Sequence, residues 1–130
     1  MIPSDKLHTI YSIRCKVNGK MYIGRTTKLD TRINIHFLEL KSGRHKTKSL
    51  LKDYQKYGRD NFEVYVLEKD IPYTEIHKEY EYMRKYNSFD EKYGYNFGDR
   101  RKKTPPSKIE IIYKMPPNIY EESITQKNDN

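Results

Sequence analysis

The sequence contains very little that could cross-link the chain or anchor it in a membrane. Cys15 is the single cysteine, which excludes an intramolecular disulfide, and four scattered histidines add too few ligands for a structural zinc site. No apolar run approaches the ~20 residues that span a bilayer. The opening MIPSDKLH also lacks the basic and then apolar regions of a signal peptide. We therefore expect an intracellular, cytoplasmic protein with no membrane partner.

Apolar residues are also scarce. Only 35% of the 130 residues are hydrophobic while 34% are charged, and tryptophan is absent. A chain of this length is typical of one domain, so we expect a single thin core. The 13 tyrosines suit such a core, because the ring can be buried while the hydroxyl finds a polar partner.

Positive charge is plentiful and unevenly distributed. The formal net charge is +8. From Arg14 to Arg59 there are 13 Lys and Arg against 3 Asp and Glu, whereas Asp60 to Phe97 holds 5 against 9. A basic segment of this density favours contact with the phosphates of nucleic acid. Charge alone is equally compatible with a solvated lysine-rich surface, so that alternative stays open.

The first strand-like segments predict a β-hairpin that carries two tyrosines. Thr9–Cys15 and Lys20–Gly24 alternate in side-chain character. They flank Asn18-Gly19, a pair typical of two-residue hairpin turns with positive φ at both positions. Tyr11 and Tyr22 lie on neighbouring strands and converge on one face if the register allows. Packing is the commoner reason for such a pair than catalysis.

Helical periodicity follows the hairpin. From Thr27 to Gly43 apolar residues recur every three or four positions, and Asp30 is placed to form a capping pair with Thr27. A second helix is predicted over Lys48–Tyr57, ended by Gly58. We therefore expect two consecutive helices after the hairpin.

The second half of the domain predicts one more strand and one more helix. Phe62–Leu67 is strand-like, and Thr74 is a candidate cap for a helix that runs to about Asn87. The expected fold is α+β, in the order β-β-α-α-β-α, with a three-stranded antiparallel sheet packed against three helices. We predict a domain over residues 1–97 and a basic, proline-containing tail over 98–130, with room for one edge strand at 109–115.

Three further polar features are unusual for a purely structural domain. Arg32 and His36 are four residues apart and share one face of the first helix, although an ordinary surface pair has the same spacing. Glu79 falls within the apolar stripe of the third helix, where a carboxylate must be paired, protonated, bound to a cation or able to reach solvent. Gly94–Asn96 is a turn-like GYN that could return to the sheet and brace a site.

These features occur together with further motifs in a fixed order. The motifs are TIY at 9–11, YIG at 22–24, TRINIHF at 31–37, SGRHKTKSLLKDYQKYG at 42–58, FEVYVLE at 62–68, EYEYM at 79–83 and GYN at 94–96. In this order they resemble the GIY-YIG nuclease family over roughly residues 7–97. The resemblance is closest to the catalytic domains of phage-type and intron-associated homing endonucleases. Ordered agreement of several motifs is far more specific than any one of them.

The resemblance implies a divalent-metal-dependent endonuclease that hydrolyses DNA phosphodiester bonds, with Mg²⁺ as cofactor and Mn²⁺ as a substitute. It implies that Tyr11 and Tyr22 help to activate the attacking water, and it leaves open which of them is the base. Arg32 would stabilise charge on the scissile phosphate, and His36 would orient or exchange a proton with the tyrosines and water. Glu79 would hold the metal ion.

The same resemblance and the basic segment imply two further groups of residues. Those expected to support the site are Asn96 and Gly24. Those expected to contact nucleic acid are His45, Arg25, Lys46, Lys48, Arg100 and Arg101. The 98–130 tail is short for a DNA-recognition region, so a nicking or short-site nuclease is as compatible with these residues as a homing enzyme.

Two other function classes stay open. Thr9 stands where the first motif of the family has glycine, which favours a catalytically weak or inactive nucleic-acid-binding module as the main alternative. The other class is a structural or regulatory protein that binds a partner protein through its tyrosine-rich surface. A monomer and a weak dimer are both compatible with the sequence.

Overall fold

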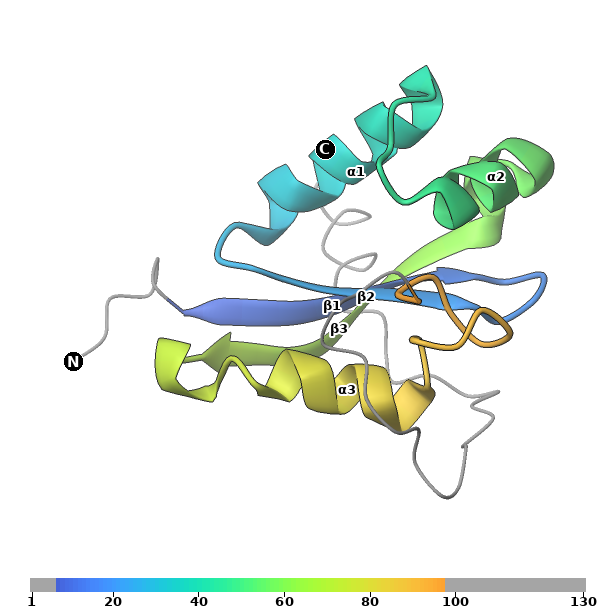
Figure 1. Ribbon diagram of the computed structural model, residues 1–130. Helices are drawn as coiled ribbons and strands as arrows, with labels where there is room; N and C mark the ends of the chain where they lie inside the picture. Colours follow the sequence, from blue (N-terminus) through green and yellow to red (C-terminus); the bar gives the residue numbers. More distant parts are fainter. Residues whose placement is uncertain (1–6, 98–130) are drawn as a thin grey trace.

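The computed structural model describes residues 7–97, which form three layers (Figure 1). The strands are β1 (His8–Cys15), β2 (Met21–Thr26) and β3 (Phe62–Ile71), all antiparallel, in the spatial order β2-β1-β3. The helices are α1 (Leu29–Ser42) and α2 (Lys48–Tyr57) on one face of the sheet and α3 (Lys78–Tyr86) on the other. Short 3₁₀ turns, η2 (Arg59–Asn61) and η3 (Tyr73–Glu75), precede β3 and α3. The predicted α+β class and element order are confirmed.

Part of the sequence-based prediction falls outside the residues that the structure describes. Arg100, Arg101, the 98–130 tail and the edge strand at 109–115 all belong to that part. Within residues 7–97, no helix is long and apolar enough to cross a membrane.

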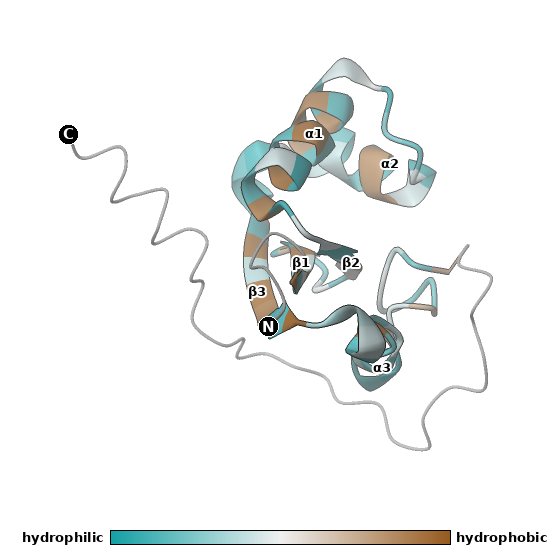
Figure 2. Cartoon of the chain, turned by 90° about the vertical axis from the view of Figure 1, so that its left-hand side faces the viewer, coloured by the Kyte–Doolittle hydropathy of each residue, from teal (hydrophilic) through white to brown (hydrophobic). Residues whose placement is uncertain are grey.

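Alternation along the strands gives the sheet an apolar cluster on each face. The cluster beneath α1 and α2 contains Tyr11, Ile13, Cys15, Ile33, Leu40, Leu50, Leu51, Phe62, Val64, Val66 and Tyr95. The cluster against α3 contains Ile10, Met21, Ile23, Ile71, Met83, Tyr86 and Phe89. Figure 2 shows hydrophobic stretches on α1, α2 and β3 between otherwise hydrophilic surfaces. Successive side chains of β1 and β2 therefore pack against opposite helical layers.

The hairpin turn differs from the prediction. Cys15 N donates to Lys20 O at 3.0 Å, so the loop contains the four residues Lys16–Gly19 and not the two residues Asn18-Gly19. Within this loop only Gly19 has a positive φ, at 76°. The Asn18 side chain accepts from Lys20 N and donates to Asp53 of α2. Because this loop and the predicted turn differ by two residues, every side chain still lies on its expected face.

Two predicted helix starts are also wrong in detail. The N-cap of α1 is Lys28 and not Thr27, Lys28 makes no side-chain capping bond, and the helix begins at Leu29. Thr74 lies in η3, and α3 begins only at Lys78. The strand before it extends to Ile71 instead of ending at Leu67. Pro72 and the 3₁₀ turn η3 separate the strand from the helix, so the capping signal at Thr74 does not mark the start of α3.

The outer edge of β2 is closed by the segment that follows α3. Met21 N donates to Tyr93 O at 3.3 Å, and Tyr95 N donates to Met21 O at 3.0 Å. Two residues on, Ile23 N donates to Asn96 Oδ1 at 2.9 Å and Asn96 Nδ2 donates to Ile23 O at 3.2 Å. The Asn96 amide thus makes the two hydrogen bonds to Ile23 that a neighbouring strand would otherwise make. Ile23 lies between Tyr22 and Gly24.

Asn96→Ala is expected to lower the free energy of unfolding by about 2–4 kcal/mol, because it removes two buried hydrogen bonds and leaves both backbone groups of Ile23 without partners. Urea denaturation measures the change. The exposed Asn34→Ala in α1 is the matched control, and it should stay within about 0.5 kcal/mol of wild type. Equal stability of both variants would contradict the bracing role of Asn96.

Candidate active site

The hairpin places its two tyrosines on the face that carries α1 and α2. Tyr11 pairs with Gly24 across the strands, and Tyr22 pairs with Ile13. The ring centroids of Tyr11 and Tyr22 are 6.5 Å apart, with Tyr11 buried and Tyr22 half-buried. The predicted convergence of the two tyrosines is therefore present in the structure.

Gly24 makes room for the Tyr11 hydroxyl. A Cβ at position 24 would lie 2.5 Å from Tyr11 Oη and 2.6 Å from its Cζ. These distances are far below ordinary van der Waals contact, and the Tyr11 ring is buried, so it has little freedom to move aside. A side chain at position 24 and the observed position of Tyr11 exclude each other.

A chain of hydrogen bonds leads from Tyr11 into the protein. Tyr11 Oη lies 2.6 Å from Nε2 of His36, which α1 supplies. His36 Nδ1 lies 2.8 Å from His45 Nε2, and the backbone N–H of Thr47 donates to His45 Nδ1 at 3.1 Å. Both imidazoles are buried and stack with centroids 5.0 Å apart. Tyr22 closes over them, with its ring centroid 5.2 Å from that of His36.

Burial keeps both histidines neutral. It lowers the pKa of His36 to about 3, with smaller contributions from Arg32, His45 and Lys46. Burial also lowers the pKa of His45. Tyr11 shifts the opposite way: burial raises its pKa, the neighbouring Tyr22 adds to the rise, and the charge of Arg32 opposes it. Near pH 7 the three groups are two neutral imidazoles and a neutral phenol.

The backbone amide of Thr47 determines the direction of this chain. Because it donates to His45 Nδ1, a neutral His45 must carry its proton on Nε2 and donate to His36 Nδ1. A neutral His36 must then carry its own proton on Nε2 and donate to Tyr11 Oη. The Tyr11 oxygen therefore accepts from the protein interior, and its own O–H is directed elsewhere.

Arg32 lies on the same face of α1 as His36, one turn earlier. Its charge lowers the pKa of Tyr11, against the larger effect of burial, and it is the second influence on His36 after burial. The guanidinium is thus close to the Tyr11–His36 pair. A fixed forked donor in this position suits a phosphate oxygen.

Glu79 approaches the site from α3, the helix on the opposite face of the sheet. Its carboxylate is buried, and Oε1 lies 3.5 Å from Arg25 Nε at the end of β2. The Glu79 charge is also one of the influences that raise the pKa of Tyr11, after burial and Tyr22, so the two groups are within electrostatic reach.

The donor set at Glu79 fits a hard divalent cation. Within residues 7–97, no three His, Cys, Asp or Glu side chains gather as a metal site. A single carboxylate is nevertheless compatible with Mg²⁺, because this ion keeps several waters and takes further oxygens from substrate phosphates. Glu79 is the residue that would hold it.

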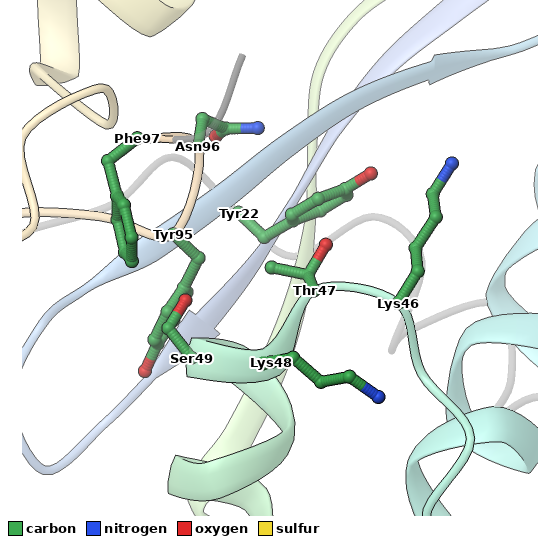
Figure 3. A pocket seen from close by; sticks show the side chains of 8 residues that line it. All are labelled: Tyr22, Lys46, Thr47, Lys48, Ser49, Tyr95, Asn96 and Phe97. Carbon is green, nitrogen blue, oxygen red and sulfur yellow. The ribbon is translucent and has the colours of Figure 1, made fainter.

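A groove of about 460 Å³ opens beside Tyr22 (Figure 3). The residues that line it are Tyr22, Lys46, Thr47, Lys48, Ser49, Tyr95, Asn96 and Phe97. In Figure 3 the Tyr22 hydroxyl and the Lys46 ammonium are directed the same way, whereas Lys48 points away from Tyr22. A positively charged groove next to the tyrosines is suited to a phosphate backbone.

Two residues predicted to contact nucleic acid do not fit that role. His45 is only 1% exposed, and both of its ring nitrogens are hydrogen-bonded inside the protein. Arg25 is turned toward α3, where it pairs with Glu79 and donates to His8 Nδ1 at 3.1 Å. Lys46 and Lys48 are exposed at the groove, and their contact with nucleic acid stays a prediction.

Two residues of the site were missed from the sequence. Thr47 acts through its backbone amide, and its side-chain type carries no signal for that role. Asp53 accepts from the Tyr95 hydroxyl at 2.7 Å and from Asn18, so it ties the hairpin loop, α2 and the GYN segment together. The signal that could have found Asp53 is its position as an isolated acid in a strongly basic segment.

Comparisons with known proteins agree with the fold described above. A model of the GIY-YIG catalytic domain family matches residues 7–96. The chain is 35% identical over 113 residues to intron-associated endonuclease 1 of Enterobacteria phage T4, a match that covers 81% of this chain and 44% of the relative. The chain thus spans less than half the length of that curated relative.

Solved structures of homing endonuclease catalytic domains are also similar to this chain. The catalytic domain of homing endonuclease I-TevI is 31% identical, with a TM-score of 0.60, over 68% of this chain and 95% of that domain. A variant of the catalytic domain of intron endonuclease I-TevI, also 31% identical, has a TM-score of 0.62 over 71% of this chain and 95% of that one. The similarity therefore extends from the motifs to the three-dimensional fold.

The neutral buried state of His36 predicts a loss of stability in mild acid. Its pKa is lowered from 6.5 to about 3, so between these values only the unfolded chain takes up the proton. Stability is therefore fully present above the unfolded pKa and falls as the pH decreases. From pH 7 to pH 5 this histidine alone should lower the free energy of unfolding by about 2 kcal/mol.

Urea denaturation at several pH values measures this effect. His36→Gln should reduce the fall between pH 7 and pH 5 by about 2 kcal/mol. His77→Gln is the matched control, because it makes the same substitution at an exposed histidine. The same pH dependence in His36→Gln and wild type would show that His36 titrates normally.

Proposed function

This chain belongs to the GIY-YIG catalytic domain family, and from that membership we propose that it is a divalent-metal-dependent endonuclease that hydrolyses DNA phosphodiester bonds. The observation that best supports the proposal is the Tyr11 oxygen, which accepts from His36 and lies near Arg32, a permanent cation. Such an oxygen is surrounded by donors suited to a negative charge. This arrangement is what a phenol needs in order to accept a proton during catalysis.

Tyr11 is the residue we assign as the proton acceptor for the attacking water. In the resting site its pKa is raised by burial, so the phenol is protonated. His36 donates to the Tyr11 oxygen and cannot also remove its proton, so Tyr11 would accept the proton of the attacking water as it passes its own hydroxyl proton to a phosphate oxygen of the substrate. Tyr22, which borders the groove, would orient the water or the phosphate at the point where the groove meets Tyr11.

Charge on the phosphate would be stabilised from two sides. Arg32 would donate to the non-bridging oxygens as the phosphate becomes five-coordinate. Glu79 would hold one divalent cation, most simply Mg²⁺ with Mn²⁺ as a substitute, which when bound supplies Lewis-acid stabilisation of phosphate oxygens. Arg32 comes from α1 and the cation at Glu79 would be held by α3, on the opposite face of the sheet. The reacting phosphate would lie between these two positive charges, at the edge formed by β2.

DNA is the substrate that the charge distribution supports best. The basic segment from Arg14 to Arg59 contains Lys46 and Lys48, and both lie at the groove beside Tyr22. The similarity to intron-associated and homing endonucleases supports a mobile-element or phage type of nuclease. A nicking or short-site activity is compatible with the same residues and is part of the proposal.

A catalytically inactive DNA-binding module is the second candidate, since Thr9 replaces the glycine of the first motif. Thr9 pairs with Thr26 in the β1–β2 ladder, a position that suits a β-branched residue. Tyr11, two residues later, keeps its bond to His36. These contacts favour the active enzyme over the inactive module.

Arg32→Ala and Glu79→Ala should each lower the rate of supercoiled-plasmid cleavage in Mg²⁺ by roughly 10²-fold or more, because each removes a stabiliser of transition-state charge. Both variants should still bind DNA, since the groove lysines are unchanged. Gel electrophoresis of the plasmid measures cleavage, and a mobility-shift assay measures binding.

Matched controls come from the same elements. Arg44→Ala removes an exposed arginine just beyond α1, and Glu81→Ala removes a 64% exposed glutamate on α3. Both controls should cut at close to the wild-type rate. If wild type leaves every plasmid intact with Mg²⁺ or Mn²⁺ while binding DNA, the inactive module is the correct function.

Gly24→Ala should lower cleavage by about 10²-fold, because the new Cβ displaces Tyr11 from the geometry in which it meets His36. Plasmid cleavage by the folded variant measures the effect. Gly58→Ala is a useful comparison, because no atom lies within 4 Å of a Cβ at that position and any loss there must come from its backbone conformation. Wild-type cleavage by Gly24→Ala would contradict the assigned position of Tyr11.

A further inference from the structure

Arg25 was predicted to contact nucleic acid, but its side chain is paired inside the protein. It lies near the end of β2, directly after Gly24. Its Nε is 3.5 Å from Glu79 Oε1, and the side chains of Arg25 and Glu79 are 26% and 10% exposed. On the other side, Arg25 Nη1 donates to His8 Nδ1 at 3.1 Å. The guanidinium is therefore held between β1 and α3, away from the groove that contains Lys46.

Strand alternation explains this direction. Met21 and Ile23 both belong to the apolar cluster on the α3 face, and Arg25 is the next residue in that series. Gly24 and Tyr22 face the opposite layer. Arg25 thus reaches Glu79 because of the register of β2, and no rearrangement of the backbone is needed to form the pair.

The pair has a consequence for cation binding. Glu79 is the carboxylate that would hold the divalent cation, and in this structure it is already paired with a monovalent cation that belongs to the protein. Two cations that share one poorly hydrated carboxylate repel each other, and the repulsion is stronger there than in bulk water. The hydrogen bond to His8 also helps to hold Arg25 in place.

We propose that Arg25 is an internal counter-ion that competes with the divalent cation for Glu79 and so sets the metal affinity of this domain. The inference rests on the proposed function, because it takes Glu79 as the metal-holding residue. When a divalent cation binds, the Arg25–Glu79 pair opens, and the Arg25 guanidinium moves off the carboxylate. When the cation leaves, Arg25 returns and keeps the buried carboxylate neutralised. Arg25 is a positioning residue, since it acts through Glu79.

The direct test is Mn²⁺ binding, measured from the electron paramagnetic resonance signal of the free ion without DNA. Arg25→Gln keeps a hydrogen-bond donor on a polar side chain but removes the charge, so it should bind Mn²⁺ roughly fivefold to tenfold more tightly than wild type. Arg25→Lys keeps the charge and should stay within about twofold of wild type. Arg44→Gln removes an equal charge far from Glu79 and should also stay within about twofold.

Glu79→Gln separates this inference from the proposed function. If wild type binds Mn²⁺, Glu79→Gln does not, and Arg25→Gln binds no more tightly than Arg44→Gln, then the counter-ion role is overturned while the metal assignment stands. If neither wild type nor Arg25→Gln binds Mn²⁺, both are overturned. Tighter binding by Arg25→Gln that disappears in the double variant with Glu79→Gln is the result expected.

A second measurement on the wild-type protein does not depend on a variant that folds. The Arg25 Nε–H resonance in a ¹⁵N spectrum should shift during a Mg²⁺ titration, because its carboxylate partner is taken by the ion. The Arg44 Nε–H resonance is the internal control and should stay in place. An Arg25 resonance that is unchanged when Mg²⁺ saturates the protein would overturn the proposal.

Discussion

The backbone hydrogen bond from Thr47 to His45 is the interaction on which the geometry of the site depends. It selects one tautomer of His45, which selects one tautomer of His36, which in turn makes the Tyr11 oxygen an acceptor. Tyr11, His36 and His45 are all buried, so these three side chains are shielded from water. Three hydrogen bonds in series link the Tyr11 oxygen to the backbone of Thr47. The phenol can therefore keep one orientation while substrate and cation bind and dissociate.

The edge of the sheet is the second constraint. Gly24 leaves space for Tyr11, Asn96 satisfies the outward backbone groups of Ile23, and Arg25 reaches across to Glu79. Ile23, Gly24 and Arg25 follow one another on β2, and their side chains alternate in direction because the strand is pleated. One short segment of β2 thus joins the tyrosines on one face to the carboxylate on the other.

The periodicity of the sequence predicted most of this fold, because the apolar repeats of α2 and of the strands match their burial closely. The motifs also indicated Tyr11, His36 and Glu79 as members of one site. The loop length, the burial of His45 and the direction of Arg25 were not predictable. The first depends on contacts of Asn18 with α2, and the other two depend on tertiary packing that local pattern does not contain.

The most direct test of the account is the tautomeric state of His36 and His45, read from long-range ¹H–¹⁵N correlations of the ring nitrogens. We expect both rings to be neutral at pH 7, each with its proton on Nε2 and an unprotonated, hydrogen-bonded Nδ1. A neutral ring with its proton on Nδ1 would mean that Tyr11 donates to His36, and it would contradict the proposed role of the Tyr11 oxygen.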